Sequence, residues 1–253
     1  MPQSRKRLDI LLVDRGLAES REQAKRSILA GSVTVDGQPS TKPDCLVPDS
    51  ASVAVLAPPR FVSRGGDKLE SAITSFRIDV TGLDCVDVGA STGGFTDCLL
   101  QHGAARVAAV DVGRGLIHWR LRGDPRVTLV EGLNARYMKK SDIPFVPSFA
   151  TIDVAFISLT AVLPAVIQVL SSDARLVTLI KPQFEAGRRD VGRGGVVRDP
   201  AVRNSVVDKI RLFGTSELGL AWNGVMQSPV IGPAGNIEFL AYWRVGDPGS
   251  KEP

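Results

Sequence analysis

Apolar residues recur at helical spacing near the start of the chain, within residues 8–12, and Gly16 then ends that short helix. A second helix follows, because Ser20 begins a capping box and the apolar positions within residues 24–28 form one stripe. Residues 32–37 alternate in polarity, end in an Asp-Gly turn and predict a hairpin. The order of these elements predicts a small α+β unit at the N-terminus.

The pattern changes in the second part of the chain, where short β-rich runs alternate with helical stretches. Such an alternation predicts a doubly wound α/β domain with a largely parallel sheet. The β-rich runs are residues 85–88, 107–111, 127–131, 150–156 and 176–180, followed by two late runs near Val225 and Ile237.

The two parts are separated by five prolines between residues 39 and 60, a composition that indicates a linker. Because prolines and charged residues there replace the periodic apolar pattern, we expect two domains that fold separately. The predicted division is a first domain over residues 1–58, a linker over 59–63, a second domain over 64–247 and a disordered tail over 248–253.

Composition and charge change this picture little. The net charge of +4 suits a polyanionic partner but also suits many proteins without one. The three cysteines are widely spaced and match neither a zinc pattern nor a disulfide framework, so we expect reduced thiols, no metal site and a cytoplasmic protein. The N-terminus lacks the apolar run of a signal peptide, and the most apolar stretch carries Asp153 and Pro164. We therefore expect no stable membrane association.

A glycine-rich segment follows the first strand of the predicted sheet, with glycines at its first, fifth and sixth positions. A dinucleotide fingerprint has them at the first, third and sixth, so a pyrophosphate ligand is disfavoured. S-adenosylmethionine (AdoMet) has no phosphates, and loop amides suit its carboxylate. Asp87 suits its ammonium or an ordered water, and Asp111, at the end of the second strand, suits the ribose hydroxyls. The candidate cofactor residues are Asp87, Gly89, Ala90, Ser91, Gly93, Gly94, Phe95, Asp111, Asn134 and Phe156.

Basic residues outnumber acidic ones in the two N-terminal helices, seven to four between residues 5 and 26. Such cations contact phosphate oxygens and fix a protein on RNA without reading its sequence. A merely solvated helix face is the alternative. A basic, glycine-rich run over 187–195 is either a second RNA contact or a mobile loop. The candidate RNA-binding residues are Arg5, Lys6, Arg7, Arg21, Lys25, Arg64, Arg188 and Arg189.

Four ionisable residues, Lys68, Asp153, Lys181 and Glu238, lie where a doubly wound fold gathers its ligand-binding groups. A charge at the carboxyl end of a buried strand points into the crevice where such sheets bind ligands. Two amines and two carboxylates together suit deprotonation of a weak nucleophile. For each residue taken singly, a surface ion pair is the alternative.

The N-terminal motifs Arg-Gly-Leu, Ser-Arg-x-x-Ala and Val-x-Val-Asp-Gly resemble the RNA-binding domain named after ribosomal protein S4. With Val-Ser-Arg-Gly-Gly-x-Lys-Leu, Asp-Val-Gly-Ala-Ser-Thr-Gly-Gly-Phe-Thr, Asp-Val-x-Phe-Ile-Ser-Leu, Lys-Pro-Gln-Phe-Glu and Gly-Asn-x-Glu, nearly the whole chain resembles the TlyA (hemolysin A type) ribosomal RNA methyltransferases. One departure is Pro59-Arg60-Phe61-Val62, which stands where some relatives have Arg-x-Trp-Val.

The resemblance implies an FtsJ-like, Rossmann-like AdoMet methyltransferase domain of seven strands, the last antiparallel. It implies 2′-O-methylation of a cytidine ribose in ribosomal RNA within ribosomal subunits, and we expect a monomer. The family's catalytic tetrad falls on Lys68, Asp153, Lys181 and Glu238. We expect Lys181 to accept the hydroxyl proton, Lys68 to steady the alkoxide, and the carboxylates to orient both lysines.

Three other functions remain open from sequence. A membrane-active hemolysin would need an amphipathic or spanning segment, which the pattern does not indicate. An RNA-binding protein without catalysis would be expected if Lys181 or the glycine loop were degraded, and both are intact. A nicotinamide-dependent dehydrogenase is distinguished by calorimetry with AdoMet and NAD.

Overall fold

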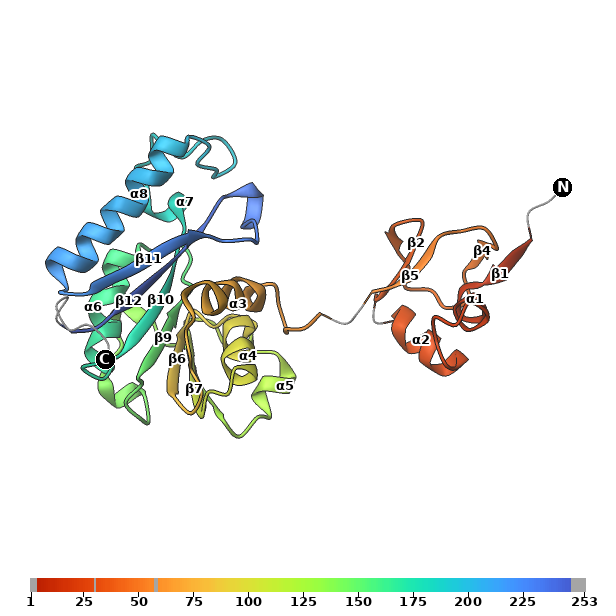
Figure 1. Cartoon of the computed structure of the whole chain (residues 1–253), viewed down its shortest axis with the longest axis horizontal. Helices are drawn as coiled ribbons and strands as arrows, with labels where there is room; N and C mark the ends of the chain where they lie inside the picture. Colours follow the sequence, from red (N-terminus) through yellow and green to blue (C-terminus); the bar gives the residue numbers. More distant parts are fainter. Residues whose placement is uncertain (1–3, 30, 57–58, 247–253) are drawn as a thin grey trace. The chain divides into compact units, whose positions relative to one another are not determined.

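The apolar stripes at the N-terminus pack into a small core of their own in the computed structural model, which describes residues 4–29, 31–56 and 59–246. Leu8, Leu12 and Ile28 are fully buried there. Two antiparallel sheets complete the unit, one of two strands and one of three. Its elements are β1 (Arg5–Arg7), α1 (Leu8–Asp14), α2 (Arg21–Leu29), β2 (Val33–Val35), β3 (Gln38–Pro39), β4 (Leu46–Pro48) and β5 (Val53–Val55) (Figure 1).

The chain divides into two units, Met1–Arg60 and Phe61–Pro253, and the division falls inside the stretch predicted as a linker. Phe61 is buried in the core of the second unit. Gly66 makes room for its ring, because a Cβ at Gly66 would lie 2.2 Å from Phe61 Cγ. The predicted end of the first domain at residue 58 and the predicted tail over 248–253 lie outside the described residues.

The second unit is built on a seven-stranded sheet with the order β11-β12-β10-β9-β6-β7-β8. Neighbouring strands among β6 to β10 run parallel, whereas β12 is antiparallel to both β10 and β11. The strands are β6 (Asp84–Val88), β7 (Arg106–Asp111), β8 (Val127–Glu131), β9 (Phe149–Ile152), β10 (Arg175–Ile180), β11 (Ala221–Gln227) and β12 (Phe239–Arg244). The predicted doubly wound fold with an antiparallel last strand is confirmed.

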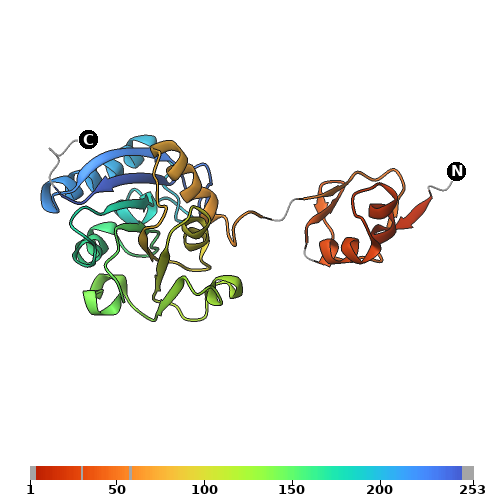
Figure 2. The same ribbon diagram turned by 60° about the horizontal axis from the view of Figure 1, so that its bottom comes forward.

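Helices cover both faces of this sheet, as the two views show (Figure 1, Figure 2). In β7, Val107 and Ala109 belong to one core and Ala108 and Val110 to the other. Burial on both faces explains why these strands read as continuous apolar runs. The helices are α3 (Gly65–Phe76), α4 (Gly94–Gln101), α5 (Trp119–Arg122), α6 (Leu159–Val169), α7 (Pro182–Glu185) and α8 (Pro200–Leu212).

The β-rich run predicted over residues 150–156 is only partly a strand, because β9 ends at Ile152. The chain then leaves the sheet, and Phe156 adopts a left-handed φ of 63°. Asp153, the first residue after the strand, pairs with Lys181. It lines a cavity at this edge of the sheet. No helix among the described residues is long and apolar enough to cross a membrane.

Candidate active site

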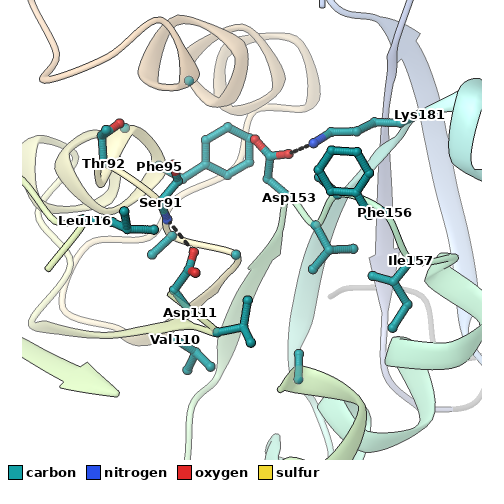
Figure 3. A pocket seen from close by; sticks show the side chains of 18 of the residues that line it. Ser91, Thr92, Phe95, Val110, Asp111, Leu116, Asp153, Phe156, Ile157 and Lys181 are labelled. Atoms are coloured by element: carbon teal, nitrogen blue, oxygen red, sulfur yellow. Dashed lines mark hydrogen bonds and ion pairs between the residues drawn. The ribbon is translucent and has the colours of Figure 1, made fainter. Parts of the chain in front are cut away.

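A cavity of about 920 Å³ opens where the parallel strands end (Figure 3). Residues at the carboxyl ends of four different strands line it: Gly89 after β6, Asp111 as the last residue of β7, Asp153 after β9 and Lys181 after β10. Carboxyl ends of parallel strands meet at one edge of a sheet, so topology alone brings these residues together. Lys68 from α3 and Glu238 before β12 complete the lining, and all four predicted catalytic residues therefore share one cavity.

Each lysine of this group is paired with one carboxylate. Lys181 Nζ lies 2.5 Å from Asp153 Oδ1 (Figure 3), and Lys68 Nζ donates to Glu238 Oε2 at 2.6 Å. The Glu238 side chain is fully buried and that of Lys68 is 10% exposed. The second oxygen, Glu238 Oε1, has no hydrogen-bond partner among the described residues. A buried acceptor without a partner is costly, so Oε1 is ready to receive a donor from a ligand.

The glycines after β6 serve the approach of other protein segments. A Cβ at Gly89 would lie 2.3 Å from the Asp153 carbonyl oxygen, and a Cβ at Gly94 would lie 2.3 Å from Ser63 Oγ. Gly89 and Gly94 also line the cavity, together with Ala90, Ser91 and Phe95. Gly93 does not line it, because it lies against Leu121, where a Cβ would be 2.3 Å from Cδ1. Gly93 therefore has a packing role, and its contact with the cofactor stays a prediction.

Asp111 is fixed at the cavity by two backbone amides. Ser91 N donates to Oδ2 at 2.8 Å and Gly113 N donates to Oδ1 at 2.7 Å. Each carboxylate oxygen has a further lone pair, so the group can still accept hydrogen bonds from a ligand. Asn134 also lines the cavity, but its Oδ1 accepts from Arg136 N at 3.0 Å and caps a short 3-10 helix.

Asp87 lies beneath the loop and is not among the residues that line the cavity, so its contact with a ligand ammonium or an ordered water stays a prediction. It is fully buried and accepts hydrogen bonds from Thr96 Oγ1 at 2.7 Å and Thr151 Oγ1 at 2.9 Å. Burial without a cation raises the pKa of this carboxyl to about 6. Asp87 therefore ties β6 to α4 and β9 and supports the loop from below.

Two family models match this chain: residues 61–245 match the FtsJ-like methyltransferase model and residues 6–50 match the S4 domain. A relative from Mycobacterium tuberculosis, 16S/23S rRNA (cytidine-2'-O)-methyltransferase TlyA, is 47% identical over 243 residues, covering 95% of this chain and 90% of the relative. This chain belongs to the TlyA-type FtsJ-like methyltransferases. The predicted resemblance is confirmed.

Other members of the TlyA type carry a hemolysin name. Hemolysin A of Brachyspira hyodysenteriae is 42% identical over 244 residues, covering 94% of this chain and 100% of the relative. A solved structure named as a hemolysin, from Streptococcus thermophilus, has a TM-score of 0.75 and 42% identity and covers 97% of this chain and 90% of that one. A methyltransferase from Listeria monocytogenes, at 17% identity and a TM-score of 0.52, shares the fold.

The predicted RNA-binding residues of this TlyA-type chain have different surroundings. Arg7 and Arg21 both bind the buried Asp9, with Nε to oxygen distances of 3.0 and 2.9 Å. Lys6 pairs with Asp14 at 2.9 Å. Arg5 and Lys25 make no ion pair within the described part of the chain. Arg64 lines the cavity, whereas Arg188 and Arg189 are exposed and do not.

Phe156 lines the cavity, and its predicted contact with the cofactor stays a prediction; the residue is 92% exposed and its ring meets that of Phe184 at a centroid distance of 5.1 Å. An exposed aromatic ring at a cavity is available for stacking with a base as well as with a cofactor. Phe156 also has a left-handed backbone conformation, which is strained for a residue with a large side chain.

Two further positions at or near the cavity were not among the predicted site residues. Gly232 lines the cavity, and a Cβ there would lie 2.3 Å from Glu238 Oε1. Asn236 is buried; its Nδ2 donates to Gly195 O at 2.9 Å and its Oδ1 accepts from Val197 N at 3.1 Å. It thereby anchors the end of the basic, glycine-rich run beside Glu238. The Gly-Asn-x-Glu motif was the available signal, but spacing alone did not give Asn236 a partner.

Proposed function

We propose that this methyltransferase transfers a methyl group from AdoMet to the 2′-hydroxyl of a cytidine ribose in ribosomal RNA. The observation that carries the proposal is the pair of lysine–carboxylate contacts, Lys68–Glu238 and Lys181–Asp153, at one cavity. The activity named for the 47% identical relative supports the choice of cytidine and of ribosomal RNA.

The cavity residues fit AdoMet. Asp111 offers a carboxylate that two amides already hold in place, which suits the two ribose hydroxyls of an adenosine. Leu133 and Asn134 line the same side and would contact the adenine, and the loop from Gly89 would face the methionine end. When bound, AdoMet supplies an electrophilic methyl group on a positively charged sulfur.

The chain's own residues would handle the proton of the ribose hydroxyl. Lys181 Nζ, once neutral, accepts that proton, while Asp153 Oδ1 at 2.5 Å keeps the amine aimed at the cavity. Lys68 Nζ places a positive charge near the forming alkoxide, and Glu238 Oε2 holds it there. Alignment of the hydroxyl with the methyl donor makes the largest contribution to the rate enhancement, because it lowers the activation barrier by roughly 7 to 11 kcal/mol.

We propose that the S4 domain delivers RNA to this cavity. Its basic residues, the exposed Arg5 and the half-buried Lys25 among them, suit phosphate oxygens, and the name of the 47% identical relative supports a ribosomal substrate. We further propose that the protein is a cytoplasmic monomer. We propose assembled ribosomal subunits as its substrate, because they present ribosomal RNA in its folded form.

The test is methyl transfer from tritiated AdoMet onto isolated small and large ribosomal subunits, followed by mapping of the label. A 2′-O-methyl group blocks alkaline cleavage of the next phosphodiester, so we expect the label in an alkali-resistant dinucleotide that begins with cytidine. Label on a base, or none on either subunit while AdoMet binds in calorimetry, would contradict the proposal. Binding of NAD in place of AdoMet would contradict the cofactor assignment.

A further inference from the structure

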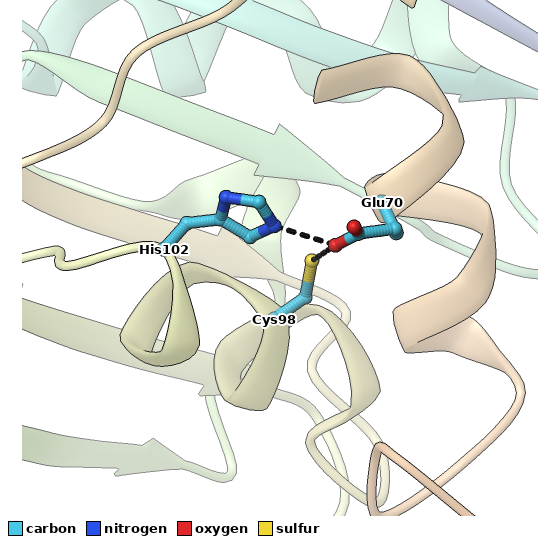
Figure 4. Close-up of side chains that lie close together, drawn as sticks. All are labelled: Glu70, Cys98 and His102. Atoms are coloured by element: carbon cyan, nitrogen blue, oxygen red, sulfur yellow. Dashed lines mark hydrogen bonds and ion pairs between the residues drawn. The ribbon is translucent and has the colours of Figure 1, made fainter. Parts of the chain in front are cut away.

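Glu70, Cys98 and His102 form a side-chain cluster outside the cavity that the proposed reaction does not use (Figure 4). Cys98 lies on α4 and His102 directly follows that helix, four positions later, while Glu70 approaches from α3. The donor atoms of all three residues lie within 4.8 Å of one another. Glu70 Oε2 is 2.5 Å from His102 Nε2 and 3.8 Å from Cys98 Sγ.

The three donors are those that Zn²⁺ prefers in proteins: a thiolate sulfur, an imidazole nitrogen and a carboxylate oxygen. Metal–ligand distances of about 2.0 to 2.3 Å in a tetrahedron place the ligand atoms roughly 3.3 to 3.8 Å apart. The distance from Cys98 Sγ to Glu70 Oε2, 3.8 Å, is already of that size. The contact from His102 to Glu70 must widen by about 1 Å. Both side chains can move, because they are 27% and 25% exposed.

We propose that Glu70, Cys98 and His102 bind one Zn²⁺ ion, with water as the fourth ligand. The Cys98 thiol loses its proton on binding, and the ion replaces the direct contact between His102 and Glu70. The affinity therefore falls at low pH, where protons compete for the imidazole and the thiolate. A hydrogen-bonded His102–Glu70 pair beside a buried thiol is the alternative.

The position of the cluster gives the ion a structural role. It lies between α3 and α4, two helices that pack on the same core. α3 also carries Lys68 in its first turn, and α4 begins at the glycine loop that lines the cavity. A bound ion would tie these helices together and so fix Lys68 relative to the loop, and stabilise the fold.

The test is a titration of the metal-free, full-length protein with Co²⁺, which takes the place of Zn²⁺ and absorbs visible light. We expect one Co²⁺ per chain, the strong visible bands of a tetrahedral site and a thiolate-to-cobalt charge-transfer band. Addition of Zn²⁺ should remove all of these bands, and Zn²⁺ should raise the thermal midpoint of the second unit.

Matched variants separate the cluster from chance binding. His102→Asn should weaken Co²⁺ binding by at least about tenfold, whereas His118→Asn, which keeps a cap for α5, should not. Cys98→Ser should abolish the charge-transfer band, whereas Cys45→Ser, at an exposed thiol, should keep it. Unchanged affinity in His102→Asn, or bands of octahedral Co²⁺ without charge transfer, would overturn the proposal. If Cys98→Ser fails to fold by circular dichroism, His102→Asn decides.

Discussion

Both units of the chain bury a carboxylate against cations, in different surroundings. In the first unit, the Asp9 side chain is fully buried, but its partners Arg7 and Arg21 are 38% and 51% exposed. In the second unit, Glu238 is fully buried and its partner Lys68 is 10% exposed. The arginines that bind Asp9 are therefore in contact with water, whereas Lys68 and Glu238 are both largely removed from bulk water and lie beside a cavity.

The exposure of the cations indicates whether a buried carboxylate serves the stability of the fold or the binding of a ligand. Two arginines hold the pKa of Asp9 down at about 2, mainly through the hydrogen bonds from Arg7, so this carboxylate stabilises the fold at neutral pH. A pair with both partners desolvated is weak evidence for stability, since apolar residues of similar volume often do as well. Such a pair is expected where its charges act on a ligand. The comparison therefore predicts a structural part for Arg7 and Arg21, whose contact with RNA stays a prediction, and a functional part for Lys68.

The largest effect on stability is expected from Lys68→Met, which leaves Glu238 buried without its cation. We expect the second unit to lose about 3 to 5 kcal/mol of unfolding free energy, together with methyl transfer. The three tryptophans all lie in that unit, so their fluorescence reports its unfolding alone. The double variant Lys68→Met/Glu238→Gln should recover most of the stability but not the activity. Recovery of both stability and methyl transfer in the double variant would contradict a functional part for Lys68.

Asp87 sharpens the comparison, because it is a buried carboxyl with hydroxyl partners and makes no ion pair within the described residues. Its pKa is raised to about 6, so the folded state binds more protons than the unfolded state and stability is lost as pH rises through that value. Asp87→Asn removes this dependence. Relative to the wild type, its unfolding free energy should rise by on the order of 3 kcal/mol between pH 4 and pH 7.

The opposite sign is expected for Asp9, whose contribution is present above about pH 4 and disappears as pH falls towards 2. Asp9→Asn should therefore be less stable than the wild type at neutral pH and approach it in acid. Hydrogen exchange of the first-unit amides is the measurement, since that unit has no aromatic residue. Equal pH profiles for the Asp9 and Asp87 variants would contradict the contrast between buried carboxylates with and without cations.

The smallest effects are expected from single basic residues of the first unit. Lys25→Ala should lower the slope of log affinity for RNA against log salt by about 1, without loss of stability. Arg7→Ala should instead speed amide exchange in the first unit, because the free energy of opening falls by about 1 kcal/mol. The loss stays this small because Asp9 keeps its ion pair with Arg21. Lys42→Ala, outside both helices, is the control for binding. An unchanged slope in Lys25→Ala would remove that residue from the RNA contacts.

Topology explains which parts of the site the sequence could predict. Alternating strands and helices indicated a parallel sheet, and such a sheet brings its carboxyl ends together, so Asp111, Asp153 and Lys181 were predictable. The pairing of Lys68 with Glu238 joins residues 170 positions apart and depends on the antiparallel last strand. No local pattern records such a contact, so the sequence placed both residues at the ligand-binding edge of the fold without showing that they pair with each other.

Two of the predicted cofactor residues have surroundings that the sequence did not indicate, for the same physical reason. Asp87 resembled a ligand-binding carboxylate, but Thr151, 64 positions away, lies on the neighbouring strand and occupies one of its oxygens. Glycines that suggested close approach of a ligand instead admit protein atoms, as Gly93 does for Leu121. The residue type was informative in each case, and the partner was set by packing between distant segments.

The most direct test of the central claim is single-turnover methyl transfer by Lys181→Met, with AdoMet binding measured by calorimetry on the same sample. We expect the rate to fall by about 10² to 10⁴-fold, because the hydroxyl loses its base, while AdoMet affinity stays within a few-fold. Lys139→Met, at an exposed lysine outside the cavity, should retain both. A Lys181→Met protein that transfers methyl groups at the wild-type rate would contradict the account.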